Sequence, residues 1–230
     1  LQSSKTKVEK AVRVFSEGIP RRLEPAGLAA LRALSGESDS DSRQLARYVA
    51  EVAVQHHSEV MPLLVLRADR FLRGGDHLAF SDEGFPSVRF TVVDENYDRQ
   101  HQDVRVKGGR AFGDVAEHID AEYLAGVTRL NVATLAHLAR APSGPRDARI
   151  VVADLGNELV LKWEPAPDPD TAGYEVVWRE TTSPVWQCRK DVGAATKVTL
   201  DLNKDNYFVG VRAYDRQRYA SPVSFPRVAR

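Results

Sequence analysis

The spacing of apolar residues changes part-way along the chain, and this change limits the fold more than any other feature. Up to about residue 140, apolar side chains recur at helical intervals or form short continuous runs. Beyond residue 148 they alternate over short stretches separated by turn-forming residues. Because 230 residues can hold two packing units, we predict two domains, 1–141 and 148–230, joined by a Pro-, Gly- and Ser-containing linker at 142–147.

Three short apolar or β-branched runs in the first domain predict strands, at 11–15, 61–66 and 87–93. The run at 61–66, MPLLVL, carries no charge. A near-continuous apolar run is typical of a strand that is buried on both faces of an α/β sheet. We therefore expect 61–66 to lie inside the sheet.

Helical spacing predicts two helices in the same domain, at 42–56 and 114–139. Ser40 or Asp41 is a good N-cap for the first helix. The pair His56–His57 ends that helix, where the helix dipole favours His, and we prefer this role to metal binding. The predicted fold class is α/β, with a partial, mostly parallel sheet and flanking helices.

The second domain has the pattern of an all-β sandwich. Turn-rich stretches such as PAPDPDTAG and NKDN separate its alternating runs. The predicted strands are 159–163, 174–180, 197–202, 207–215 and 221–225.

Composition narrows the classes of partner. The chain has 32 basic and 32 acidic residues, so no net charge draws it to nucleic acid or to an anionic membrane surface. No apolar run approaches the roughly 20 residues that span a bilayer. Cys188 is the only cysteine, which excludes an intramolecular disulfide and a Cys-rich zinc site. No signal peptide is visible in 1–18.

Three fragments of the first domain, GGDHLAF at 74–80, GFPSVRF at 84–90 and NYDRQHQDVR at 96–105, occur in a suggestive order. Together they resemble the C-terminal half of a co-catalytic zinc exopeptidase of the bacterial leucyl aminopeptidase and aminopeptidase Y type. In that superfamily an Asp-His-x-x-Phe segment precedes a Gly-x-Pro strand start, and the loop after the strand carries the last zinc-binding His. The resemblance implies an aminopeptidase that cleaves N-terminal peptide bonds with a water activated by two zinc ions.

The resemblance also implies roles for single residues. His101 would be the last zinc ligand, Asp76 a supporting group near the metal, and Asp98 and Asp103 the groups that orient His101. A pocket for an apolar N-terminal side chain would be lined by Phe80, Phe85 and Tyr97, although core packing is an equally good reading of the two Phe residues.

The chain departs from the family pattern in what it lacks. It contains no Glu-Glu pair to supply a general base, and its His-x-Asp matches, at 101–103 and 118–120, come too late in the order. The resemblance therefore implies a C-terminal portion that lacks the general base, is inactive alone, holds no zinc by itself, and needs the N-terminal half of the peptidase domain as partner and a peptide as substrate.

The second domain resembles a fibronectin type III domain through Trp163, Tyr174, Leu200 and Tyr207, which we expect to be core residues. Such a domain binds or spaces rather than catalyses. An alternative to the enzyme is thus a non-catalytic binding module made of a peptidase-like and a fibronectin-like domain. The likeness to bacterial exported peptidases implies a periplasmic or secreted location.

Overall fold

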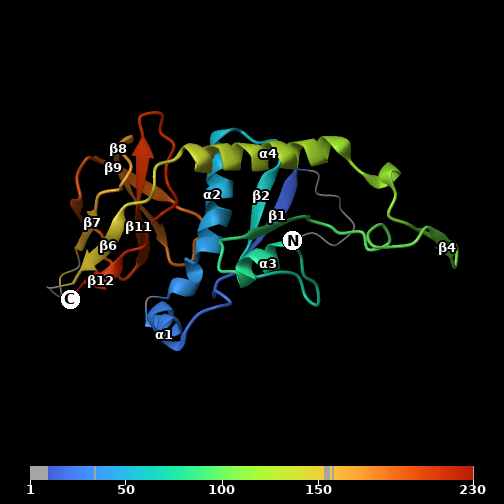
Figure 1. Cartoon of the computed structure of the whole chain (residues 1–230), viewed down its shortest axis with the longest axis horizontal. Helices are drawn as coiled ribbons and strands as arrows, with labels where there is room; N and C mark the ends of the chain where they lie inside the picture. Colours follow the sequence, from blue (N-terminus) through green and yellow to red (C-terminus); the bar gives the residue numbers. More distant parts are fainter. Residues whose placement is uncertain (1–9, 34, 153–155, 157, 230) are drawn as a thin grey trace.

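The computed structural model describes residues 10–33, 35–152, 156 and 158–229. Figure 1 shows a β-sandwich at one end, a small sheet with helices α2 and α4 in the middle, and a hairpin that projects at the other end. Within the described residues no helix is long and apolar enough to cross a membrane.

The central sheet has three strands in the order β2-β1-β3: β1 (Ala11–Ser16), β2 (Met61–Val65) and β3 (Val88–Val92). These bounds confirm the three predicted strands. β1 is parallel to β2 and antiparallel to β3, so the sheet is mixed rather than mostly parallel as predicted.

Helix α2 (Asp41–Gln55) covers one face of this sheet and confirms the predicted helix at 42–56. The Ser40 hydroxyl accepts a hydrogen bond from the Arg43 amide at 3.2 Å, as an N-cap should. Helix α4 (Ala121–Arg140) packs on α2 and starts seven residues later than predicted, where Asp120 caps it. The core between sheet and helices consists of Val12, Val14, Ala46, Val49, Ala53, Val60 and Leu130.

Short elements complete this part of the chain. They are the helices α1 (Pro25–Ala33) and α3 (His77–Asp82), two turns of 3-10 helix at Gly36–Ser38 and Ala116–His118, and the hairpin strands β4 (Arg105–Lys107) and β5 (Arg110–Phe112).

The prediction that 61–66 is buried on both faces is wrong. Met61 and Leu63 are 41% and 46% exposed. β2 lies at the edge of the sheet, and these two side chains point away from α2 because alternate strand residues face opposite ways. Their side of β2 is open in the part of the chain that the structure describes.

The sandwich consists of two sheets. One is mixed and has the order β10-β7-β6-β12, and the other is antiparallel and has the order β11-β8-β9. The strands are β6 (Arg146–Val151), β7 (Leu159–Glu164), β8 (Thr171–Glu180), β9 (Cys188–Gly193), β10 (Lys197–Leu200), β11 (Tyr207–Asp215) and β12 (Arg227–Ala229).

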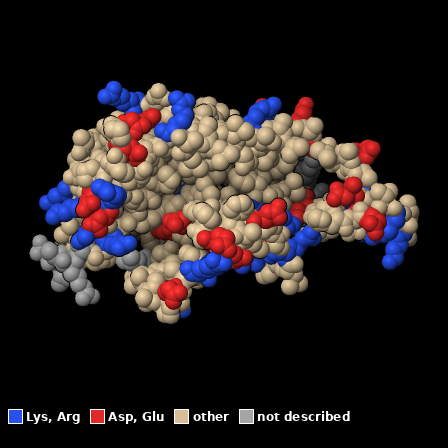
Figure 2. Space-filling view, in the orientation of Figure 1, with Lys and Arg blue, Asp and Glu red and all other residues tan. Residues whose placement is uncertain are grey.

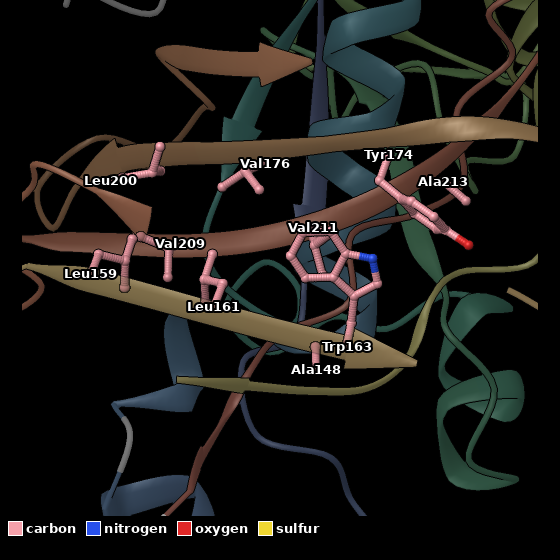
Figure 3. Close-up of a cluster of buried hydrophobic side chains, with 10 residues drawn as sticks. All are labelled: Ala148, Leu159, Leu161, Trp163, Tyr174, Val176, Leu200, Val209, Val211 and Ala213. Carbon is pink, nitrogen blue, oxygen red and sulfur yellow. The ribbon is translucent and has the colours of Figure 1, made fainter. Parts of the chain in front are cut away.

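Four of the five predicted sandwich strands are confirmed, but the fifth is not. Residues 221–225 form one isolated bridge, between Ser224 and Val211, instead of a strand. β6 and β9 were not predicted, and β6 begins inside the linker expected at 142–147. Trp163, Tyr174 and Leu200 lie in the core between the sheets, as expected (Figure 3). Tyr207 is partly buried and packs against this core.

Buried charges join the sandwich to the helical part. Arg47 of α2 lies 3.0 Å from Asp39, and Arg179 of β8 binds the same carboxylate oxygen. The three side chains are 2 to 5% exposed. Arg47 also donates to the Pro184 carbonyl of the sandwich at 2.8 Å. Two cations around one anion make this junction sensitive to loss of the carboxylate.

We predict that Asp39→Asn lowers the free energy of unfolding by about 3–5 kcal/mol, because it leaves two buried guanidinium groups without a counter-charge. The matched control is Glu83→Gln, which removes an ion pair with Arg22 whose side chains are both 63% exposed. That change should cost at most about 1 kcal/mol. Urea unfolding measures the free energy of unfolding of both variants, and an equal loss of stability in the two would contradict the assigned role of Asp39.

Candidate functional site

His101 lies in the segment that leads from β3 to the projecting hairpin. Its backbone has φ of 53°, a left-handed conformation that is uncommon for a residue other than glycine. The amide of His101 donates to the Asp114 carboxylate at 3.2 Å. The residue is exposed, and its ring has no hydrogen-bond partner among the described residues. A free imidazole is thus held on a fixed piece of backbone.

Two backbone hydrogen bonds close the loop around His101. The Asp114 amide donates to the Gln102 carbonyl at 3.1 Å, and the Gly113 amide donates to the Asp98 carbonyl at 2.9 Å. The Asp98 carboxylate pairs with Arg110 of β5, not with His101 as the resemblance implied. Asp114, which sequence reasoning missed, is the carboxylate that binds the His101 backbone.

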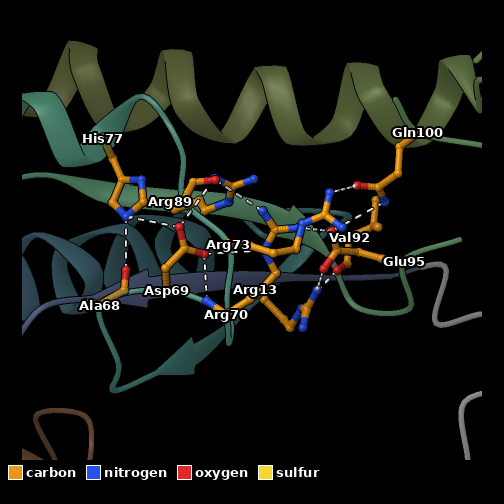
Figure 4. A network of polar contacts seen from close by, with 11 residues as sticks. Arg13, Ala68, Asp69, Arg70, Arg73, His77, Arg89, Val92, Glu95 and Gln100 are labelled. Atoms are coloured by element: carbon orange, nitrogen blue, oxygen red, sulfur yellow. Dashed lines mark hydrogen bonds and ion pairs between the residues drawn. The ribbon is translucent and has the colours of Figure 1, made fainter. Parts of the chain in front are cut away.

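Glu95 ties the base of this loop to the rest of the domain (Figure 4). Its side chain is 4% exposed and pairs with Arg13 of β1 at 2.7 Å and with Arg70. It also accepts a hydrogen bond from Gln100 at 3.4 Å, and Gln100 in turn accepts one from Arg73 at 3.2 Å. Gln100, which precedes His101, is therefore held by side chains from two other positions, Glu95 and Arg73.

A second cluster continues the network behind the loop at 66–76. Asp69 accepts from the Arg70 amide at 2.7 Å and lies 3.5 Å from Arg89 of β3. His77 donates from Nε2 to the Ala68 carbonyl at 3.0 Å, which fixes its tautomer. A Cβ on Gly75 would lie 1.7 Å from Arg89 Nη1, so this glycine allows the close approach of the loop.

The other residues that the resemblance named lie at exposed positions. Asp76 and Asp103 are exposed, and Asp76 precedes α3 without capping it through its side chain. Phe80, Phe85 and Tyr97 are 59%, 62% and 53% exposed. The core alternative for the two Phe residues is therefore wrong, while the pocket stays a prediction.

The ligands available for zinc do not add up to a complete site. No group of three or more His, Cys, Asp or Glu side chains within the described residues is arranged to hold a metal ion. Catalytic zinc takes about three protein ligands. His101 offers one free imidazole, and a zinc ion held by it would need further ligands that the described residues do not place beside it.

The surface around the site carries both signs of charge. Figure 2 shows acidic and basic side chains interspersed over one face, including the projecting hairpin at its right end. The view agrees with the zero net charge of the chain.

Comparisons of sequence point to zinc proteases. The chain is 43% identical over 216 residues to a probable zinc metalloprotease of Leptosphaeria maculans and 42% identical over 217 residues to one of Pyrenophora tritici-repentis. It covers 50% and 45% of these proteins, so it spans about half the length of the curated relatives it matches. They are fungal, which corrects the expectation of a bacterial protein. No protein-family model matches the chain.

Comparisons of structure return fibronectin-type domains. A Fn3-like protein from Clostridium thermocellum aligns with 39% of this chain and 96% of its own, at 20% identity and a TM-score of 0.31. The FN1-FN3 domains of chicken CNTN1 align with 36% of this chain and 30% of their own, at 21% identity and a TM-score of 0.32. TM-scores this low carry no argument about the fold, so the sandwich is described from its own strand order.

We predict that Glu95→Gln frees the His101 loop, because it leaves Arg13 without its carboxylate partner and leaves Arg70 with Asp69 alone. Amide exchange at residues 96–102 should become at least tenfold faster, as about 1.4 kcal/mol of lost local stability requires. Asp103→Asn is the matched control, since its exposed side chain makes no hydrogen bond in the described structure. Unchanged exchange in Glu95→Gln would show that other contacts hold the loop.

Proposed function

We propose that this chain is the C-terminal part of a zinc-dependent aminopeptidase and that His101 is one of its zinc ligands. The observation that carries the proposal is the free His101 imidazole on a loop fixed by Asp114 and by the Glu95 network. The names of the relatives support a zinc peptidase, and 94% of the chain aligns with them.

The remaining zinc ligands and the general base would come from a segment outside residues 1–230. Two observations support this step: the relatives are about twice as long as this chain, and Met61 and Leu63 form an open apolar side on the edge strand β2. β2 is also the end strand of the sheet among the described residues, and an unpaired strand edge next to an uncovered apolar face invites contact with another segment. The N-terminal half of the peptidase domain would cover it, and the 230 residues alone would bind no zinc and be inactive.

The substrate in this proposal is a peptide with a free N-terminus. Phe80, Phe85 and Tyr97 are exposed aromatic groups in the segments before and after β3, where they would contact an apolar first residue of the substrate. Asp76 would support the metal site. Secretion is part of the proposal, and recovery of the protein from the medium of its source organism tests it.

A binding module without catalysis is the second candidate. His101 is the single candidate zinc ligand among the described residues, and this shortage of ligands favours the binding module. The two candidates differ in what the complete protein does, so the test uses that protein.

We predict that the complete protein, including whatever its gene encodes before Leu1, contains zinc and cleaves an aminoacyl anilide. His101→Ala should lower both zinc affinity and turnover roughly a hundredfold or more, since a ligand contributes at least as much as the groups that orient it. His118→Ala is the control, because His118 belongs to the other His-x-Asp match and lies in a 3-10 turn.

Elemental analysis and the anilide assay measure the two properties. Zinc and activity retained in His101→Ala would show that His101 is not a ligand. A complete protein without zinc or turnover would favour the binding module.

A further inference from the structure

Two histidines that the proposed site does not use face each other at the junction of three elements. His56 is the C-cap residue of α2, and His137 lies in the last turn of α4. Their Nε2 atoms are 2.6 Å apart, and the two rings are nearly perpendicular at 87°. His56 is exposed, whereas His137 is 5% exposed. This contact adds a second role to the helix-end position expected for His56.

The other side of His137 touches the sandwich. Its ring packs edge-on against Tyr219, with 4.7 Å between ring centres. Tyr219 belongs to the turn at 215–220 after β11, which the Asp215 carboxylate holds by accepting from the Tyr219 amide at 2.8 Å. Arg140 of α4 lies 4.5 Å from the Tyr219 ring centre and donates to Gln217 at 2.6 Å. The histidine pair therefore lies where α2, α4 and this turn meet.

The short contact admits only one proton between the two nitrogens. With one proton present, one Nε2 donates and the other accepts. A second proton would place two N–H groups and two positive charges against each other, and the contact would have to open.

The groups around the pair do not favour a second positive charge. Glu51 of α2 is paired with Arg212 of the sandwich at 2.6 Å, and Glu59 is paired with Arg129 of α4 at 3.2 Å. Arg218 of the sandwich and His57 are also nearby, lining the cavities that His137 and His56 border. The carboxylates are thus already engaged, and Arg140 adds positive charge beside His137.

The direction of the pH effect follows. Burial lowers the pKa of His137, and the positive charges of His56 and Arg140 lower it further. A histidine whose pKa is lower in the folded protein contributes stability above its unfolded value of about 6.5. That contribution is lost as the pH falls from about 6.5 toward the folded value.

We propose that His56 and His137 form a pH-sensitive latch that holds the 215–220 turn of the sandwich against α2 and α4 at neutral pH and releases it in acid. The buried pair of Arg47 and Arg179 with Asp39 shares no residue with the latch and keeps the sandwich attached. His137 also lines a cavity of about 740 Å³ between α2 and the sandwich. Release of the latch therefore changes one wall of that cavity.

The test compares the chain with two single variants. His56→Gln removes one titrating ring from an exposed position and retains a side chain that can hydrogen-bond with His137. His57→Asn is the matched control, because it removes the neighbouring histidine at the same helix end and Asn tolerates the left-handed backbone there, with φ of 49°. All samples contain a chelator, so that the imidazoles cannot hold a metal ion.

We expect amide protection factors at 215–221 to fall about tenfold or more between pH 7 and pH 5 in the unmodified chain and in His57→Asn, because release of the latch lowers the local stability of the turn. His56→Gln should lose part of this pH dependence, because the charge of His56 is gone while burial and Arg140 still disfavour the His137 cation. NMR titration of the His137 ring should show its midpoint at higher pH in His56→Gln than in the unmodified chain, because the neighbouring positive charge is gone. A pH-independent turn in the unmodified chain, or the full pH dependence in His56→Gln, would overturn the proposal.

Discussion

The excess positive charge buried between α2 and the sandwich is the constraint on which the rest of the structure depends. Arg47 and Arg179 share the single carboxylate of Asp39. Aromatic rings stabilise the remaining positive charge by cation–π contacts. The ring centre of Trp186 lies 5.8 and 5.4 Å from the guanidinium carbons of Arg47 and Arg179, and that of Phe208 lies 4.4 Å from the guanidinium carbon of Arg179. Such contacts are strongest where water is excluded. Because α2 also packs on the central sheet, one helix fixes both halves of the molecule.

This arrangement separates two polar networks in space. The sandwich and the hairpin beyond His101 lie at opposite ends of the molecule in Figure 1, with α2 and α4 between them. The Glu95 network at the His101 loop and the histidine pair at the sandwich have no residue in common. Opening the histidine pair therefore breaks none of the contacts of the Glu95 network.

Local patterns predicted most of the regular structure, and contacts between distant residues account for what was missed. The helix at 42–56 and the strand at 207–215 have clear periods and end where the structure ends them, to within a residue. β9, with the sequence CRKDVG, has no apolar alternation and forms because β8 offers it a partner. The open side of β2 could not be predicted from its sequence either, because the burial of a strand depends on which distant segment covers it.

The candidate site was predictable only in the residue that would touch the metal. His101 follows from a motif, whereas Asp114 and Glu95 act through folding contacts that no short motif contains. A left-handed backbone at a residue other than glycine costs roughly 1–2 kcal/mol and persists only where its surroundings impose it. At His101 the surroundings that impose it are the Asp114 contact and the closed loop. The backbone of His101 is consequently fixed in the folded chain, while its exposed ring makes no hydrogen bond with the described residues. If His101 binds zinc as proposed, the backbone part of the ordering of this ligand is already complete.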